Sequence, residues 1–384
     1  MSTISVINVK HPSSASNNLV TDSSGNTTAA GTVAMGSSFL RNRIINGAMV
    51  IDQRNAGAAV TTAGYYVDRW KSDTTFNASF SVQQNAGSVT PPVGFTNYLG
   101  FTSTAAYSPG TNTTYCLTQS VEGYNVADFA WGTASAKTIT ISFWVRSSLT
   151  GTFSGAVTNN VTDRSYVFSF SINAATTWEY KTITIPGDTT GTWLTNNGIG
   201  LNLRFNLGTG TGTFGTTTAN AWQTGNFVGL TSGVQVSATN GATFYITGVQ
   251  LEVGTVATPF ERRLYGTELA LCQRYFTNWV GDSSGTGFRA IGNGYVPAAT
   301  TDLVTLIPLS VSMRTTPTLS YSGSIGVVSG NIAGTVSSIP NVYASSNQSM
   351  WAIVRTGATF VTGQGGIVYT QNASTNFFSA SAEL

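Results

Sequence analysis

The stretch VQLEVGTVATPFERRLYGTELALCQRYF, residues 249–276, contains a change of side-chain rhythm that sets the organisation of the chain. From Val249 to Val253, apolar residues alternate with polar ones, which is the period of a strand with one buried face. From Thr267 the period becomes helical, because Thr267 can cap a helix and Glu268 suits its first turn. The apolar residues that share one helical face are Leu269, Cys272 and Phe276. We predict that a β-domain ends here and that the longest helix of the chain leads into a second domain.

The clearest strand patterns lie upstream, in residues 41–265. In KTITISFWVRSS (137–148) and LNLRFNLG (201–208), every second residue is a large apolar one. The residues predicted to face the core are Ile139, Ile141, Phe143, Val145, Leu201, Leu203, Phe205 and Leu207. Turns rich in Gly, Asn and Thr separate such segments, as is typical of a two-sheet sandwich. The length suits a jelly roll with long loops, and the order and spacing of the strands resemble those of jelly-roll carbohydrate-binding modules.

Two further segments flank this predicted sandwich. Residues 1–40 have short, interrupted apolar alternation among turn formers, so we expect an extended arm that does not fold alone and is either a flexible tail or a segment that orders against a partner. Residues 266–384 begin with the helix and continue as six short strands, which predicts a smaller C-terminal β-domain. The predicted fold is therefore all-β: an N-terminal arm, a jelly-roll-like β-sandwich, a short helix and a second β-domain.

The composition excludes several classes of protein. Charged residues make up 8% of the chain, but the 41% hydrophobic and 11% aromatic content is that of packed cores, not of disorder. A net charge of +2 with scattered Lys and Arg argues against nucleic-acid binding. No apolar run approaches the length of a membrane span, and the N-terminus has no secretory-signal pattern, so we expect synthesis in a cytoplasm and no membrane insertion.

Catalytic and metal-binding residue types are scarce. The single histidine, His11, lies in the predicted arm, and Cys116 and Cys272 are best explained as buried hydrophobes. We therefore predict no enzyme activity, no metal and no cofactor. A glycan-cleaving enzyme remains an alternative, because carboxylates distant in sequence can meet in space. The closest acidic groupings are Asp52 with Asp68, Glu122 with Asp128, and Asp163 with Glu179.

Aromatic and polar side chains support ligand binding better than catalysis. Strand parity directs Trp144, together with Arg146, away from the predicted core, although burial beneath a loop or against another subunit is an alternative for Trp144. Trp193 and Trp222 lie in Gly/Thr/Asn-rich loops, and Asn202 and Arg204 are predicted to face outward. We assign Trp70, Trp178 and Trp279 to cores. The candidate glycan-binding residues are Trp144, Arg146, Trp193, Asn202, Arg204 and Trp222.

Several segments resemble a known family. The spaced pattern QLEVG, ATPFE, YG and ELALCQRYF within 250–276 resembles a recurrent stretch of tailed-bacteriophage tail-fibre and related virion proteins. NRIINGAMVIDQRNAG (42–57) with YYVDRW (65–70) is similar to the opening of the same family. The first residues are similar to leaders of such proteins in marine and cyanobacterial phages, and FFSASAEL (377–384) to their usual ending.

This resemblance implies a virion protein of the phage tail that attaches to the host surface. Its expected partners are other virion tail proteins, further copies of itself in a homotrimer, and host cell-surface polysaccharide. The arm would provide virion attachment, with candidate residues Ile4, Val6, Val9 and His11. A purely structural adaptor or decoration protein, a glycan-cleaving tailspike enzyme and a bacterial carbohydrate-binding module remain alternatives.

Overall fold

The computed structural model describes residues 8–9, 19–21, 27–29, 40–72, 79–281, 288–298, 301–343, 346–371, 373 and 375–384. The chain divides into two compact units, residues 1–41 and 42–384. In the first unit, three short strands form an antiparallel sheet in the order β1-β2-β3. They are β1 (Asn8–Val9), β2 (Leu19–Thr21) and β3 (Thr27–Ala29).

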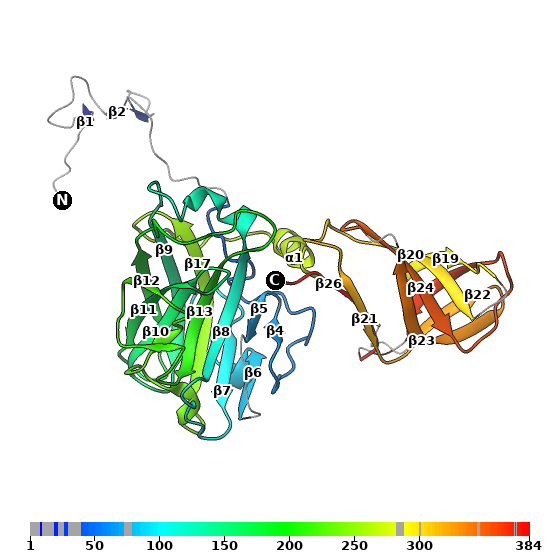
Figure 1. The fold of residues 1–384 in the computed structure, drawn as a ribbon, viewed down its shortest axis with the longest axis horizontal. Coiled ribbons are helices and arrows are strands. Elements are labelled where there is room, and N and C mark those ends of the chain that lie inside the picture. The colour runs from blue at the N-terminus through cyan, green and yellow to red at the C-terminus, as the bar shows by residue number, and fades with distance from the viewer. Residues whose placement is uncertain are drawn as a thin grey trace. The chain divides into compact units, whose positions relative to one another are not determined.

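In the second unit, residues from Asn42 to Val253 form a β-sandwich of two sheets (Figure 1). The seven-stranded sheet has the order β15 (Trp222–Thr224), β11 (Arg164–Ile172), β10 (Gly151–Thr158), β13 (Ile199–Thr209), β8 (Thr114–Glu122), β5 (Trp70–Ser72) and β4 (Tyr65–Val67). The five-stranded sheet has the order β12 (Glu179–Ile185), β9 (Ile139–Ser147), β17 (Thr243–Val253), β7 (Leu99–Ser103) and β6 (Phe80–Gln84). The connections contain the 3-10 turns η1 (Ala86–Ser88), η2 (Gly123–Asn125), η3 (Ala127–Phe129) and η4 (Val236–Ala238).

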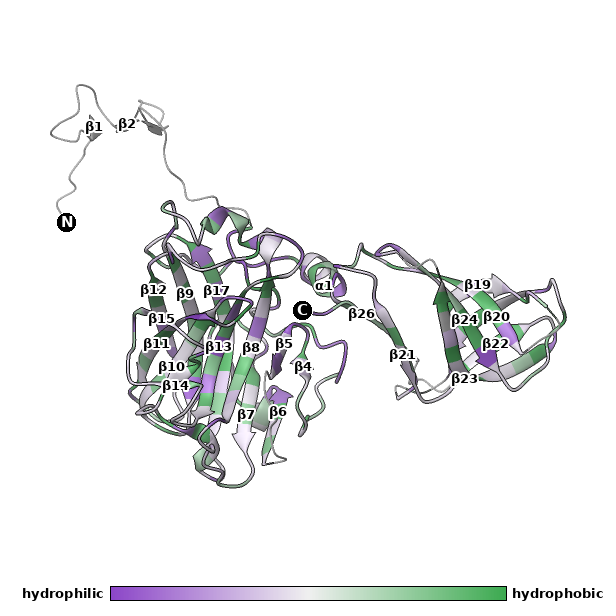
Figure 2. Ribbon diagram, in the orientation of Figure 1, coloured by the Kyte–Doolittle hydropathy of each residue, from purple (hydrophilic) through white to green (hydrophobic). Residues whose placement is uncertain are grey.

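Side-chain alternation builds the core between the two sheets. The residues Ile139, Ile141, Phe143 and Val145 of β9 and Leu201, Leu203, Phe205 and Leu207 of β13 are all fully buried. Phe143 and Phe205 meet edge to face, with ring centroids 5.0 Å apart, so the two sheets interlock through aromatic rings. Figure 2 shows hydrophobic and hydrophilic residues interleaved along these strands. The predicted sandwich and the inward faces of both strands are confirmed.

The outer face of the seven-stranded sheet is covered by residues 210–235. This segment contains the short parallel pair β14 (Gly215–Thr216) and β16 (Gly229–Leu230) and packs Leu230 and Phe227 against Ala156 and Val167. As a result, the polar face of β13 lies beneath a layer of chain.

Helix α1 (Tyr265–Gln273) follows the sandwich and is the single α-helix in the described part of the chain. Thr267 was predicted to cap it, but the N-cap is Leu264, and no side chain caps the helix end. Phe276 was predicted to lie on the helix and instead lies in β18, where it pairs with Ser381. Cys272 and Leu269 pack against Ile45 and Ile51, and after the helix the chain pairs with β26 as a strand. No helix among the described residues has the length and apolar character of a membrane span.

The C-terminal part contains a small sheet and a closed barrel (Figure 1). The sheet has the order β18 (Phe276–Val280), β26 (Phe377–Ser381) and β21 (Thr318–Ser322). The six barrel strands follow one another as β19 (Arg289–Tyr295), β20 (Asp302–Pro308), β24 (Ser349–Thr356), β23 (Ile332–Tyr343), β22 (Ile325–Ser329) and β25 (Gly365–Thr370). Leu303, Ile307, Val327 and Met350 fill its interior.

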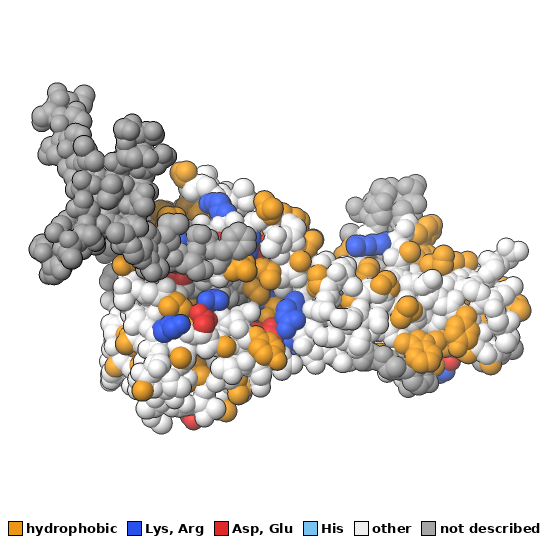
Figure 3. Space-filling model, turned by 90° about the horizontal axis from the view of Figure 1, so that it is seen from above, with side chains coloured by type: hydrophobic (Ala, Val, Ile, Leu, Met, Phe, Trp, Pro, Cys, Tyr) orange, Lys and Arg blue, Asp and Glu red, His pale blue; other side chains and the backbone are white. Residues whose placement is uncertain are grey.

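The outer face of the barrel carries an apolar belt. Cross-strand register places Val328 opposite Ile367, and Leu306 opposite Trp351, with Asn293 pairing with both Ile367 and Leu306. Leu306, Trp351 and Ile367 are each more than 40% exposed. We call Val328, Ile367, Leu306 and Trp351 the barrel belt. Figure 3 shows apolar side chains on the surface of the C-terminal part.

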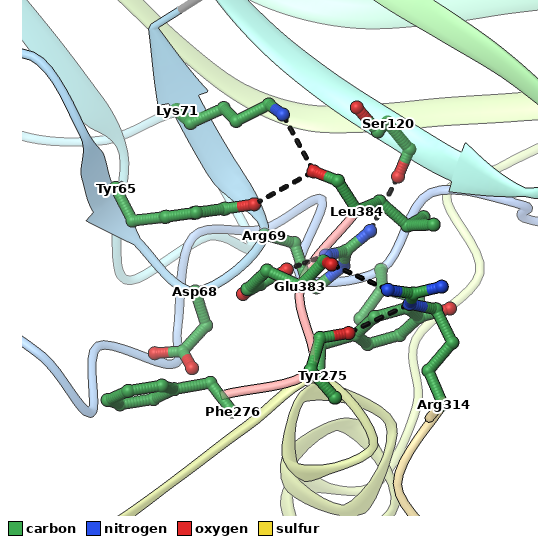
Figure 4. Close-up of polar contacts among 12 residues, drawn as sticks. Tyr65, Asp68, Arg69, Lys71, Ser120, Tyr275, Phe276, Arg314, Glu383 and Leu384 are labelled. Atoms are coloured by element: carbon green, nitrogen blue, oxygen red, sulfur yellow. Dashed lines mark hydrogen bonds and ion pairs between the residues drawn. The ribbon is translucent and has the colours of Figure 1, made fainter. Parts of the chain in front are cut away.

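The final residues return to the sandwich (Figure 4). Glu383 forms ion pairs with Arg69 and with Arg54. The Leu384 oxygen accepts hydrogen bonds from Lys71 Nζ at 2.8 Å and from the Tyr65 hydroxyl at 3.4 Å. Arg69, which pairs with Glu383, lies next to the fully buried core residue Trp70.

Candidate functional site

An open aromatic site of the sandwich lies on the outer face of the five-stranded sheet. It is a hollow of about 500 Å³ between strands β9, β12 and β17 and the loops of residues 89–98 and 254–264. Its lining residues are Phe95, Trp144, Tyr180, Gly248, Ala257, Thr258, Pro259, Phe260 and Arg262. We call it the aromatic hollow.

Strand parity and register place the first pair of rings. Because Val145 points into the core, Trp144 must point outward, and it is half-buried there. Tyr180 of β12 lies directly opposite Trp144, and the two ring centroids are 5.4 Å apart. Tyr180 is 44% exposed, so the pair presents apolar surface to solvent.

A β-bulge opens the floor of the hollow. The pairing of β17 with β9 shifts between Thr247 and Gln250, and Gly248 within the bulge has a φ of 61°. A Cβ atom on Gly248 would lie 2.6 Å from Cζ of Phe95 and 3.2 Å from Cδ1 of Trp144. Glycine is therefore required here both for its left-handed backbone and for the space between the two rings.

The second pair of rings carries a cation. Phe95 and Phe260 meet edge to face, with centroids 5.2 Å apart. The guanidinium carbon of the exposed Arg262 lies 4.8 Å from the Phe95 centroid and 5.8 Å from that of Phe260. These distances are those of cation–π contacts, which hold the guanidinium plane against the aromatic surface.

Arg263, the next residue, points the other way. Its guanidinium donates to the carbonyl oxygens of Ile44 and Asn42 and pairs with Glu268 at 3.3 Å. Glu268 also accepts a 2.5 Å hydrogen bond from the Asn46 backbone N–H. Thus Arg263 links the start of the sandwich, at Asn42 and Ile44, to Glu268 of helix α1, whereas Arg262 faces the hollow.

Carboxylates near the hollow are already engaged. Glu252 is buried and accepts hydrogen bonds from the Thr258 backbone N–H at 2.8 Å and the Thr258 hydroxyl at 2.7 Å. Glu261 accepts the Asn42 backbone N–H at 2.7 Å and lies 3.8 Å from Arg263. Among the hollow's lining residues, Arg262 is the one charged side chain, so the site is apolar with a single positive charge.

The acidic groupings noted in the sequence bind other partners. Glu122 pairs with Arg274 and accepts the Tyr275 hydroxyl at 2.7 Å. Asp128 pairs with Arg43 at 2.9 Å, Asp163 accepts Asn159, and Glu179 pairs with Lys181 at 2.6 Å. In the described residues, no group of three or more His, Cys, Asp or Glu side chains is placed to hold a metal ion.

Asp52 and Asp68 accept hydrogen bonds from the loop of residues 53–57. Asp52 accepts the N–H groups of Asn55 and Gly57, and burial raises its pKa. Asp68 accepts the backbone and side-chain N–H groups of Gln53 at 2.6 and 2.8 Å. Burial raises the pKa of Asp68 to about 6.

Trp193 and Trp222, both candidate binding residues, join a cluster with Trp131. The centroid distances are 4.7 Å for Trp131–Trp193, 5.3 Å for Trp131–Trp222 and 5.5 Å for Trp193–Trp222, all edge to face. Their indole N–H groups donate to the carbonyl oxygens of Lys137, Thr190 and Pro186. Rings that pack on one another and donors already bonded to backbone favour a structural role for this tryptophan cluster.

Asn202 and Arg204 point away from the core as predicted, but they are not exposed to solvent. They are 4% and 7% exposed, and the segment of residues 210–235 contacts Arg204 through Asn226. Asn202 accepts the Ser120 hydroxyl at 2.7 Å, and Arg204 donates to the Asn226 side chain at 3.1 Å. The alternation along the strand correctly predicted which side chains point away from the core. It gives no information on whether another segment of the chain covers them.

The remaining candidates are placed as follows. Arg146 donates to the Thr176 carbonyl oxygen at 2.8 Å and lies 5.4 Å from the Tyr245 ring centroid, next to Trp144 on the same face. Trp178, assigned to a core, is only partly buried; Trp70 and Trp279 are confirmed as core. Ile4, Val6 and His11 lie outside the described residues, and Val9 belongs to β1.

Phe95, Tyr180, Phe260 and Arg262 were not identified as site residues from the sequence. Arg262 belongs to the longest basic run of the chain and follows Phe260, so a signal existed within the 249–276 stretch. Tyr180 could be found only from the register of β12 against β9.

Comparisons with known proteins were made for sequence and for structure. No family model and no curated protein matches the sequence. A solved CBM4 structure is similar at 16% identity, covering 54% of this chain and 98% of that one, with a TM-score of 0.27. TmCBM61 in complex with β-1,4-galactotriose is 12% identical over 56% of this chain and 99% of that one, with a TM-score of 0.28. The enzymatically active domain of bacteriophage CBA120 tailspike protein 4 is 12% identical over 57% of this chain and 22% of that one, with a TM-score of 0.29. At such values, the function must be argued from the site.

Proposed function

We propose that this chain binds glycan without cleaving it and that the aromatic hollow is its binding site. The observation that carries the proposal is the pairing of Trp144 with Tyr180 and of Phe95 with Phe260 around one exposed hollow. The C–H faces of a sugar ring pack on flat aromatic surfaces, and polar groups at the edge fix its orientation. Arg262 provides such a polar group at the edge of the hollow.

The biological setting we propose is the tail of a phage particle, where the chain attaches the virion to the host surface. The resemblance of residues 42–70 and 249–276 to tail-fibre-type proteins supports this. The arm, with Ile4, Val6, Val9 and His11, would connect the chain to other tail proteins. Several weak sites held on one particle would give an avidity far above the affinity of one site.

We also propose that the chain forms a homotrimer. The barrel belt supports self-association, since Leu306, Trp351 and Ile367 expose large apolar side chains on neighbouring strands, with Asn293 between Ile367 and Leu306. From Phe288 to Thr370 the sequence contains few charged residues, and Asp302 pairs with Arg355, so little charge repulsion opposes contact between identical surfaces.

The test is binding of purified full-length protein to a panel of bacterial surface polysaccharides and to intact bacteria. We expect wild-type binding to be weakened about tenfold or more by Trp144→Ala and by Tyr180→Ala. Tyr124→Ala is the matched control, because Tyr124 is 63% exposed elsewhere on the sandwich and should not affect binding. Release of reducing ends is measured in the same samples.

Three results would contradict the proposal in different ways. Binding to polysaccharide that is unchanged by both hollow variants would place the site elsewhere. No binding to any cell or polysaccharide would favour a structural role in the particle. Reducing-end release by the wild type would make the chain an enzyme.

A further inference from the structure

We infer that the aromatic hollow selects acidic glycans, through an ionic hydrogen bond from Arg262 to a carboxylate or sulfate group on the sugar. This inference rests on the proposed glycan-binding function and adds the chemical class of the ligand. Three observations support it: the contacts of Arg262 with two aromatic rings, the hydrogen bonds that already occupy the neighbouring carboxylates, and the absence of a second charged residue among those that line the hollow.

The contacts of Arg262 leave its hydrogen-bonding edge available. Its guanidinium carbon lies 4.8 Å from the Phe95 ring centroid and 5.8 Å from that of Phe260. The Arg262 side chain is exposed to solvent, and its five N–H donors lie in the plane of the guanidinium. A planar fork of donors matches the two oxygens of a carboxylate, and it also matches a sulfate.

The local carboxylates do not neutralise this cation. Glu252 is bonded to Thr258, and Glu261 to the Asn42 backbone and to Arg263. Within the described residues, no ion pair involves Arg262, although the adjacent Arg263 pairs with Glu268. An anion brought by the ligand would therefore find one positive charge in an otherwise uncharged hollow.

A glycine next to the hollow accommodates the cation. Gly94 has a φ of 88°, and a Cβ atom added there would lie 2.8 Å from a terminal nitrogen of Arg262. A side chain at this position would push the guanidinium off the ring, so Gly94 positions Arg262 without contributing a charge. Gly94→Ala therefore changes the placement of the cation while leaving the net charge of the protein unchanged.

The experiment uses the full-length protein on an array of neutral, uronate-bearing and sulfated oligosaccharides built on matched backbones. We expect the acidic sugars to bind about tenfold or more tightly than their neutral counterparts, with affinity falling as salt rises. Arg262→Gln should remove this preference, because it should weaken the binding of acidic sugars much more than that of neutral ones. Arg262→Lys should keep part of it, and Gly94→Ala should reduce it. The uronate and sulfate arms identify the preferred anion.

A matched control separates local from bulk charge. Arg289→Gln removes one exposed positive charge on the barrel and should leave acidic and neutral binding unchanged. Neutral sugars that bind as well as acidic ones, or an equal loss of both in Arg262→Gln, would overturn the inference but leave the glycan-binding proposal standing. Failure of the wild type to bind any sugar would overturn both.

Discussion

Glu383 forms a buried ion pair with Arg69, a residue 314 positions earlier in the chain. Arg69 is 2% exposed, its guanidinium carbon lies 3.6 Å from the Tyr275 ring centroid, and it donates to the Ser120 carbonyl oxygen. Glu383 also pairs with Arg54, so one carboxylate neutralises two arginines of the sandwich (Figure 4). These ion pairs therefore fix the last residues of the chain to the β-sandwich.

Glu383→Gln should lower the stability of the protein strongly. The substitution leaves Arg69 buried without its counter-charge, and loss of one partner of a buried ion pair costs about 3–5 kcal/mol. The free energy of unfolding from urea denaturation is the measurement.

Asp128→Asn is the control for that prediction. It breaks the ion pair with Arg43, in which the Asp128 side chain is 46% exposed and the Arg43 side chain 25%. Exposed ion pairs contribute less than about 1 kcal/mol to stability. Equal losses in the two variants would show that the joint does not depend on Glu383.

Protonation of Asp68 should make the folded protein more stable in mild acid than at neutral pH. Burial raises its pKa to about 6, above the ordinary value of 3.8, so the folded state takes up its proton at higher pH than the unfolded chain. The stabilisation is complete below about pH 4 and is lost as the pH rises through 6, a difference of about 3 kcal/mol.

Urea denaturation of the wild type and of Asp68→Asn between pH 5 and 7 measures this effect. In this range the wild type should gain stability as the pH falls, relative to the variant, because Asn does not titrate. Asp52, whose pKa is also raised, is present in both proteins and cancels in the difference. Parallel curves for the two proteins would exclude Asp68 as the titrating group.

Gly248→Ala should abolish most glycan binding. The added Cβ would enter the space between Phe95 and Trp144, and the left-handed backbone would cost about 1–2 kcal/mol of stability. Gly241→Ala is a close control, since Gly241 has a φ of 77° and has no atom within 4 Å of an added Cβ. Both variants should lose similar stability, and only Gly248→Ala should lose binding in a polysaccharide titration.

Trp131→Ala should affect stability but not binding. Trp131 is 7% exposed and contacts both Trp193 and Trp222, so its removal opens a large cavity and costs about 3–5 kcal/mol. Trp144→Ala should show the reverse pattern, with weakened binding and a smaller loss of stability. If Trp222→Ala weakened glycan binding while thermal unfolding stayed unchanged, the tryptophan cluster would itself be a binding surface.

The barrel belt should control self-association. Replacing Leu306 and Trp351 with Ser removes apolar surface from a face that already meets solvent, so the barrel should stay folded. Light scattering of the full-length protein should then report a lower mass than for the wild type. An unchanged mass would exclude the belt as a contact between copies.

Sequence patterns predicted the sandwich well because its strands obey a simple local rule. In β9 and β13, a two-residue period fixes which side chains enter the core, and all eight predicted residues are buried. The helix was predicted in the right region, but its end was not, because the pairing of Phe276 with Ser381 is a contact across 105 positions that no local pattern records. The candidate site was predicted in part: Trp144 lies in the hollow, whereas Trp193 and Trp222 pack with Trp131.

The sequence by itself determined the all-β class, the inward and outward parity of each long strand and the place of the helix, since these depend on neighbours within a few residues. Only the tertiary structure decided which outward side chains stay exposed. Arg204 and Trp144 both point away from the core, yet Arg204 is buried against Asn226 of the segment 210–235, and a glycine bulge keeps Trp144 beside an open hollow. Register, bulges and covering loops are set by packing between distant segments, and they convert a strand pattern into a site.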